Sequence, residues 1–188
     1  MLEGFEDVAR LYFEGQGYIV SGSVSIPFVG DKETKRRERQ LAAVGPTDPA
    51  IQIDLVAARA DELVICEVKS WFKSTGLVFD RHFSDDPSGR EIKLFRNEQY
   101  RNYVARNLAK RFRYKFEQVS FALVSGKARP ADVPEIREHF KERKWLFLTS
   151  ADIAKSIVER AMAGHYVNDS AVAMIRCLEA AELLKVES

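Results

Sequence analysis

The pattern of hydrophobic positions predicts a buried hairpin near the middle of the chain. Residues 51–57 and 63–69 are short, apolar and rich in β-branched side chains, and residues 59–62 between them read as a tight turn. Side chains alternate between the two faces of a strand, so Glu67 and Lys69 lie on the same face. The second strand is therefore apolar on both faces until its end, where an acid and a base appear.

A helix is predicted ahead of the hairpin, over residues 2–15, with glycines after it. Its apolar and polar positions separate onto two sides, and Glu6 is the exception. At about 100° per residue, Glu6 lies roughly 20° from Phe13 and 40° from Leu2, on the margin of the buried side. An acid at this place either reaches out to water or points to an interior site.

The rest of the pattern alternates between strands and helices, which predicts an α/β fold. The segment 31–39 is highly charged and is predicted to be a loop, and 70–89 is a long connection in which 76–79 fits a short extra strand. The other predicted strands are 17–29, 119–125 and 145–148, and the other predicted helices are 91–113, 135–142, 150–161 and a last one from about 168.

Length and composition indicate one soluble globular unit. The 188 residues are 46% hydrophobic and 30% charged, and we expect a core at 1–149 with a helical extension at 150–188 packed on it. The net charge of +1 excludes a general attraction to nucleic acid, so any such surface is a local basic patch. Cys66 and Cys177 form no disulfide framework, which favours a cytoplasmic location. No apolar run reaches membrane-spanning length, and the first residues lack a signal-peptide pattern.

The polar residues at the hairpin end are the candidate chemistry. Asp54 lies on the strand next to Glu67 and Lys69, and such groups are costly to desolvate unless they bind something. One interpretation is a divalent-metal site, in which the two acids are hard oxygen ligands and Lys69 polarises a water or holds a phosphate. The other is an ion pair between Lys69 and one of the acids, without chemistry.

This arrangement resembles the PD-(D/E)xK nuclease superfamily, which includes restriction endonucleases, archaeal Holliday-junction resolvases and RecB-family exonucleases. Asp54 stands at the first motif, with Ile53 in place of the proline, and Glu67-Val68-Lys69 stands at the second. The likeness covers roughly residues 1–125. It implies a restriction-endonuclease-like α/β/α sandwich around a small mixed sheet, whereas periodicity alone reaches only α/β.

The resemblance also implies roles for further residues. A glutamate of the first helix commonly joins the metal cluster, and Glu6 matches it; the Val68 carbonyl is an additional ligand. Gln99 and Tyr103 reproduce the Q-x-x-x-Y motif that RecB-like nucleases carry on the helix after the second motif. These two side chains are expected to hydrogen-bond phosphate oxygens and the attacking water without adding charge.

Two groups of basic residues are candidates for DNA binding, and the alternative for each is an ordinary solvated surface. They are Lys35, Arg36, Arg37 and Arg39 before the hairpin and Arg106, Lys110 and Arg113 on the second main helix.

The expected function is hydrolysis of DNA phosphodiester bonds with Mg²⁺, for which Mn²⁺ can substitute. The alternative functions are a catalytically inactive nuclease fold that binds nucleic acid or assembles with partners, and a structural protein with a buried ion network. A homodimer, a partner protein or the shape of the DNA is expected to supply specificity, because no sequence-reading motif is visible.

Overall fold

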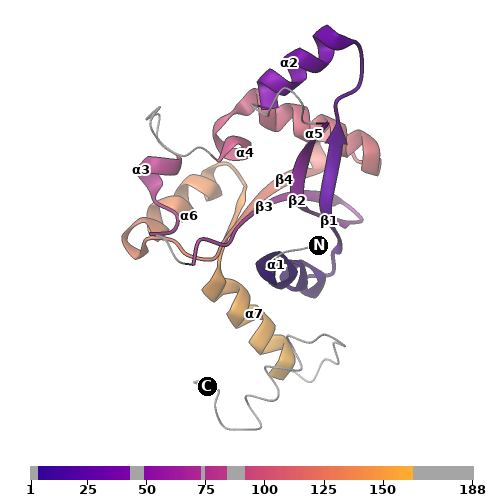
Figure 1. The fold of residues 1–188 in the computed structure, drawn as a ribbon. Coiled ribbons are helices and arrows are strands. Elements are labelled where there is room, and N and C mark those ends of the chain that lie inside the picture. Colours follow the sequence, from indigo (N-terminus) through magenta and orange to yellow (C-terminus); the bar gives the residue numbers. More distant parts are fainter. Residues whose placement is uncertain (1–3, 43–48, 73–74, 84–91, 163–188) are drawn as a thin grey trace.

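The fold is organised around a mixed β-sheet (Figure 1). The computed structural model describes residues 4–42, 49–72, 75–83 and 92–162 of the chain. Within these ranges the sheet has five strands in the order β1-β2-β3-β4-β5, of which β1, β2 and β3 pair antiparallel and β3, β4 and β5 pair parallel. The strands are β1 (Ile19–Pro27), β2 (Ala50–Arg59), β3 (Glu62–Lys69), β4 (Val119–Ser125) and β5 (Leu146–Thr149).

Helices cover both faces of the sheet. The described helices are α1 (Gly4–Gly15), α2 (Lys32–Ala42), α3 (Phe79–His82), α4 (Lys93–Arg96), α5 (Glu98–Phe112), α6 (Val133–Glu142) and α7 (Ser150–Met162). Leu108 of α5 and Phe140 of α6 belong to the core on one face, whereas Phe13 of α1 and Ile157 of α7 belong to the core on the other. The expected α/β/α sandwich is therefore confirmed.

Strand β3 separates these two cores by alternation, as the sequence predicted. Leu63 and Ile65 pack on the α5 face, and Val64 and Cys66 pack on the α1 face. All four are at most 3% exposed. Burying an aliphatic side chain of this size contributes about 1.5–3 kcal/mol, so this strand is a major source of stability.

Strand β2 departs from regular alternation at Asp54. Ile53 packs on the α5 face, but Leu55 and Ala57 pack on the α1 face, although residues two apart on a regular strand share a face. The register with β1 runs through Ile53 and Leu55 and omits Asp54, and the facing Ser23 has a left-handed φ of 50°. Strand β2 thus changes faces at Asp54.

The prediction of a loop at 31–39 is wrong, because these residues lie in α2 (Lys32–Ala42). The Asp31 carboxylate accepts the backbone N–H of Thr34 at 2.8 Å, and an ion pair joins Glu33 to Arg37 one turn later. N-capping and i,i+4 pairing form this helix from a sequence with no apolar stripe.

The predicted helix at 91–113 and strand at 76–79 also need correction. The helix is interrupted at Asn97, whose side chain accepts the backbone N–H of Tyr100 at 2.9 Å and so begins α5. Leu77 makes a single β-bridge to Ala128, and α3 begins at Phe79, so 76–79 is not a strand.

The remaining predicted elements are confirmed within a residue or two, with the exception of the last helix. That helix, from about 168, and Cys177 lie outside the described residues. The described part of the extension, α7, packs on α1 and β5, and Arg160 donates to the carbonyl of Leu11 at 3.2 Å. Among the described residues, no helix is both long and apolar enough to cross a membrane.

Candidate functional site

The carboxylate of Asp54 is held at the end of the β2–β3 pairing. The printed register ends at Leu55 opposite Cys66, and one further step places Asp54 opposite Glu67. Here the Asp54 side chain replaces the backbone as acceptor, because its Oδ2 receives the N–H of Val68 at 2.7 Å. The change of face in β2 thereby directs a carboxylate to the end of β3.

Glu67 and Lys69 lie at this same end. The Lys69 ammonium hydrogen-bonds to Oε1 of Glu67, and the two side chains are 28% and 22% exposed. The next parallel strand fixes the backbone here, because the N–H of Gly126 donates to the carbonyl of Lys69 at 2.7 Å. Carboxyl ends of parallel strands are the usual location of ligand sites in α/β folds.

The electrostatics of this group show an excess of negative charge. Burial and then the charge of Glu67 raise the pKa of Asp54 to about 6, against smaller opposing effects of the Val68 N–H and Lys69. Burial disfavours the charged form of Lys69, but the carboxylate of Glu67 outweighs it and the pKa of Lys69 is raised. One ammonium therefore does not neutralise the acids that surround it, and a bound cation would.

Glu6 reaches the same group from α1. Its charge contributes to the raised pKa of Asp54, of Lys69 and of the buried thiol of Cys66. The charges of Glu6, Asp54, Glu67 and Lys69, from three elements that the sequence analysis singled out, therefore influence one another.

Tyr100 is a member of this site that the sequence analysis missed. Its side chain is 8% exposed, and burial followed by the charges of Glu67 and Asp54 raises the pKa of its hydroxyl. A phenol with a raised pKa stays protonated and remains a hydrogen-bond donor. Tyr100 lies four residues before Val104 on the buried stripe of α5. This spacing in the sequence predicts that Tyr100 faces the sheet.

The two residues of the Q-x-x-x-Y motif lie elsewhere on α5. Gln99 is exposed and lines a pocket beside Asn97 and Arg101. Tyr103 is partly buried, and burial and then the neighbouring carboxylate of Glu38 on α2 raise its pKa to about 12. Within the same five-residue run, Tyr100 is the side chain whose hydroxyl pKa is influenced by the charges of Glu67 and Asp54.

The donor set fits a Mg²⁺ site that a substrate completes. Among the described residues no group of three or more His, Cys, Asp or Glu side chains is arranged to hold a metal. Mg²⁺ is commonly held by one or two carboxylates, with waters and substrate phosphates filling its other positions. Asp54 and Glu67 supply two carboxylates, and Val68, next to Glu67 in β3, donates its N–H to Asp54.

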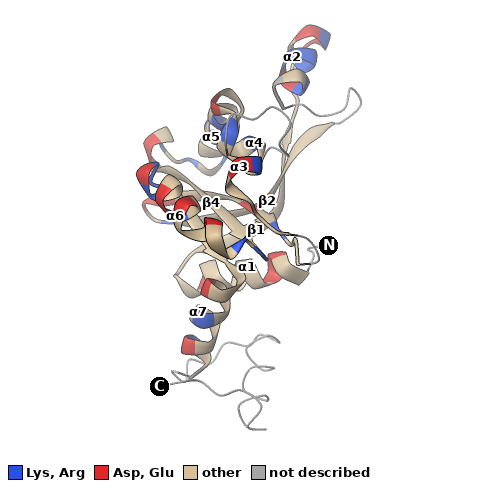
Figure 2. Ribbon diagram, turned by 90° about the vertical axis from the view of Figure 1, so that its left-hand side faces the viewer, with Lys and Arg blue, Asp and Glu red and all other residues tan. Residues whose placement is uncertain are grey.

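The two basic groups predicted from sequence lie on neighbouring helices, since α2 packs against α5. Helix α2 has five basic and two acidic residues, and α5 has four basic and one acidic; Figure 2 shows blue segments on both helices. Arg36, Arg37, Arg106, Lys110 and Arg113 are exposed, whereas Lys35 and Arg39 are partly covered, with Arg39 lying 5.5 Å from the Phe28 ring centroid. This surface is a candidate for contact with a polyanion.

Comparisons of the chain with protein-family models, with curated proteins and with solved structures gave no match. The resemblance to PD-(D/E)xK nucleases therefore rests on the residues of its sequence motifs alone.

Proposed function

We propose that this protein is a metal-dependent phosphodiesterase that hydrolyses DNA. The observation that carries the proposal is the carboxylate of Asp54, fixed by the Val68 N–H beside Glu67 and Lys69 and raised in pKa to about 6. An acid with a strongly raised pKa beside a second carboxylate and a lysine is typical of catalytic sites.

Each residue has a distinct role in this proposal. Asp54 and Glu67 hold Mg²⁺ or Mn²⁺, with Glu6 and the Val68 carbonyl as additional ligands, and the cation lowers the pKa of a bound water and neutralises charge on the phosphate. Lys69 orients the attacking water. The protonated hydroxyl of Tyr100 donates to a phosphate oxygen, a position that the motif reserves for Gln99 and Tyr103.

The DNA backbone would lie along the basic surface of α2 and α5. Sequence-independent binding of this kind comes from phosphate contacts and weakens with salt. We place the protein in the cytoplasm, where the buried Cys66 stays a free thiol. A second copy or a partner protein would supply substrate choice.

Cleavage and metal binding test the proposal together. Linear, nicked, branched and single-stranded DNA are incubated with the protein and Mg²⁺ or Mn²⁺, and metal binding is measured by calorimetry. The variant Asp54→Asn should lose both, whereas Asp61→Asn, which changes an 81% exposed acid in the β2–β3 turn, should keep both.

Three outcomes separate the candidate functions. Cleavage with metal binding supports the nuclease. DNA binding without cleavage or metal binding supports the inactive nucleic-acid-binding fold. Absence of all three activities leaves the acids and Lys69 as a structural ion network.

A further inference from the structure

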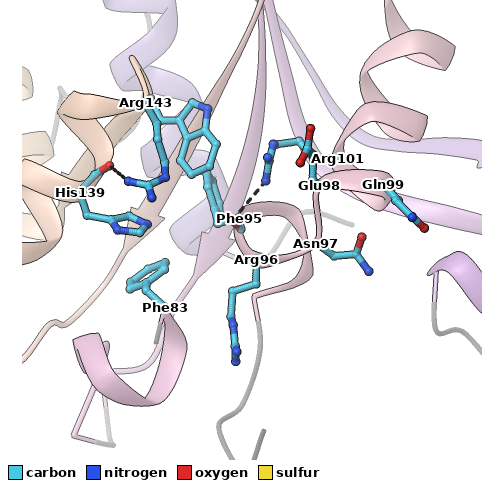
Figure 3. Close-up of a pocket in the computed structure, with 10 residues that line it drawn as sticks. Phe83, Phe95, Arg96, Asn97, Glu98, Gln99, Arg101, His139 and Arg143 are labelled. Atoms are coloured by element: carbon cyan, nitrogen blue, oxygen red, sulfur yellow. Dashed lines mark hydrogen bonds between the residues drawn. The ribbon is translucent and has the colours of Figure 1, made fainter. Parts of the chain in front are cut away.

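A second concave site lies between α4, α5 and α6, and the acids of the candidate metal site do not line it (Figure 3). Its volume of about 640 Å³ falls in the range of roughly 300–1,000 Å³ that small-molecule sites occupy. Its walls combine aromatic rings with guanidinium groups: Phe83, Phe95 and Trp145 with Arg96, Arg101 and Arg143.

Two of the guanidinium groups are held in place around one aromatic ring. Arg101 lies 4.7 Å and Arg143 lies 5.8 Å from the ring centroid of Trp145. Each is anchored through Nη1, Arg101 to the carbonyl of Phe95 at 3.2 Å and Arg143 to that of His139 at 3.0 Å (Figure 3). Among the contacts of the described residues, Nη2 and Nε of both side chains remain for a ligand.

The charges at this pocket favour an anion. Burial and then Arg143 lower the pKa of His139, which keeps the imidazole neutral at about pH 7. Burial lowers the pKa of Arg101, and Arg143 lowers it further while Glu98 opposes them. Glu142 lies 3.5 Å from Arg143, but at 64% exposure its charge is largely solvated. For Arg101 burial is the main cost, and the attraction of Glu98 exceeds the repulsion of Arg143. Arg96, Arg101 and Arg143 still outnumber Glu98 among the charged residues that line the pocket, and an anionic ligand would offset the cost of burying Arg101.

We propose that this pocket binds one nucleotide, with its phosphate held by Arg101 and Arg143 and its base packed against the partly buried Trp145 and the guanidinium planes beside it. Guanidinium forks match the geometry of phosphate oxygens, and aromatic rings stack on bases with little sequence preference. A simple inorganic anion would make no use of the aromatic walls.

The nucleotide can come from the substrate strand or from free nucleotide. Arg101 follows Tyr100 directly in α5, so one strand crossing the start of that helix would meet both the pocket and the carboxylate pair. The assignment to the substrate strand rests on the proposed function, whereas nucleotide binding itself does not.

The fluorescence of Trp145 reports occupation of the pocket directly. The chain has two tryptophans, and Trp71→Phe leaves Trp145 as the single emitter. In EDTA, deoxyadenosine monophosphate should change the emission saturably, while deoxyadenosine and inorganic phosphate should each bind at least about tenfold more weakly. Equal binding of phosphate and the mononucleotide, or no binding of either, would overturn the proposal.

A matched pair of variants separates the pocket from general charge. Arg143→Gln should weaken mononucleotide binding about tenfold. Lys141→Gln removes the same charge two residues earlier, at the end of α6, but its side chain is 79% exposed and lies outside the pocket, so affinity should stay unchanged. Equal weakening by both variants contradicts a specific site. If Trp71→Phe does not fold, calorimetry on the chain with both tryptophans gives the same comparison.

A competition experiment distinguishes the two sources. A short oligodeoxyadenylate that displaces the mononucleotide identifies the substrate strand, and one that does not identifies free nucleotide. Nucleotide binding with no DNA cleavage refutes only the nuclease, and DNA cleavage with no nucleotide binding refutes only the pocket.

Discussion

The ammonium group of Lys69 hydrogen-bonds to Glu67, which keeps it next to the carboxylates without making it a metal ligand. If it positions the attacking water, its interaction is made chiefly in the transition state. Lys69→Ala should therefore bind Mg²⁺ and DNA nearly as well as the parent and lower kcat by about 10²–10⁴-fold. Single-turnover cleavage and calorimetry measure the two effects.

Excess Mn²⁺ provides the control for that variant. It should partly restore Asp54→Asn, whose defect is weak metal binding, and should not restore Lys69→Ala. Lys69→Arg keeps the charge but changes the donor geometry, so it should recover little activity. Near-normal cleavage by Lys69→Ala would refute the role of the lysine.

Tyr100 and Tyr103 allow a direct comparison between placement and motif. Tyr100→Phe removes only the hydroxyl that lies near Glu67 and Asp54, and we expect kcat to fall about 10²-fold with stability and DNA affinity nearly unchanged. Tyr103→Phe, whose hydroxyl is next to Glu38, should leave kcat unchanged. The opposite ranking would show that the motif residues, not Tyr100, contact the phosphate.

The raised pKa of Asp54 predicts that the metal site reduces stability in the absence of metal. The folded-state pKa is about 6, above the usual value of 3.8, so the folded protein binds the proton more tightly than the unfolded chain. The destabilising contribution is absent below about pH 4, grows as the pH rises towards 6, and is complete above it.

Asp54→Asn removes that contribution while its amide oxygen still accepts the Val68 N–H. In EDTA, urea unfolding should therefore show the variant about 1–3 kcal/mol more stable than the parent near pH 7, with little difference near pH 4. Asp61→Asn serves as the exposed control and should show no such pH-dependent gain. A variant that is less stable near pH 7 would contradict the proposed charge balance.

At the scale of elements, a reciprocal cap fixes the start of α7. Asp152 Oδ2 accepts the N–H of Thr149 at 2.8 Å, Thr149 Oγ1 accepts the N–H of Asp152 at 3.3 Å, and Arg137 of α6 pairs with the same carboxylate at 2.8 Å. Burial opposes ionisation of Asp152, but these bonds to Thr149 and Arg137 outweigh it and lower its pKa.

Asp152→Ala should lower the free energy of unfolding by about 1–2 kcal/mol at neutral pH, which is the usual value of a lost helix cap. A lowered pKa gives stability that is present above the unfolded-state value and lost as the pH falls, so the difference should shrink towards pH 3. Urea unfolding at neutral and acidic pH checks both statements. Glu159→Ala, at an exposed position of α7, is the control.

The elements that hydrophobic periodicity controls were predictable from the sequence, and those held by polar contacts were not. Strands β3 and β4 contain buried apolar runs, and these runs predict strands directly. Seven of the eleven residues of α2 are charged and the helix begins at the Asp31 cap, so the sequence contains no apolar stripe that predicts it. Gln99 and Tyr103 were selected because they match a sequence motif, whereas the buried residue of the same turn of α5 is Tyr100.

For the whole molecule, the order of the strands and the grouping of charged residues on the surface depend on the three-dimensional fold. The net charge of +1 hides a basic surface because α2 and α5, both basic, are far apart in sequence and adjacent in space. The meeting of Asp54 with Glu67 could be predicted because a tight turn fixes the hairpin register. The position of Glu6 relative to the hairpin depends on how α1 packs on the sheet. The sequence predicted only the angle at which Glu6 lies on its helix.

The basic surface makes a prediction at this scale. Replacing Arg106 and Lys110 together by alanine should weaken DNA binding about equally for all sequences. It should also reduce the slope of log affinity against log salt by roughly one unit per lost contact. Fluorescence anisotropy over a range of salt measures both. Lys141→Ala with Lys155→Ala removes two exposed charges from α6 and α7 and should leave the slope unchanged.

The change of face in β2 places the candidate site within reach of charges from both layers of the sandwich. A carboxylate on a regular strand faces one layer of a sandwich, and the sheet shields it from the other layer. Asp54 sits where the pleat reverses, and its titration responds to Glu6 from α1 as well as to Glu67, whose charge also reaches Tyr100 from α5. The irregular pairing at Ser23 and Asp54 therefore places one carboxylate where charges carried by α1 and by β3 both influence its titration.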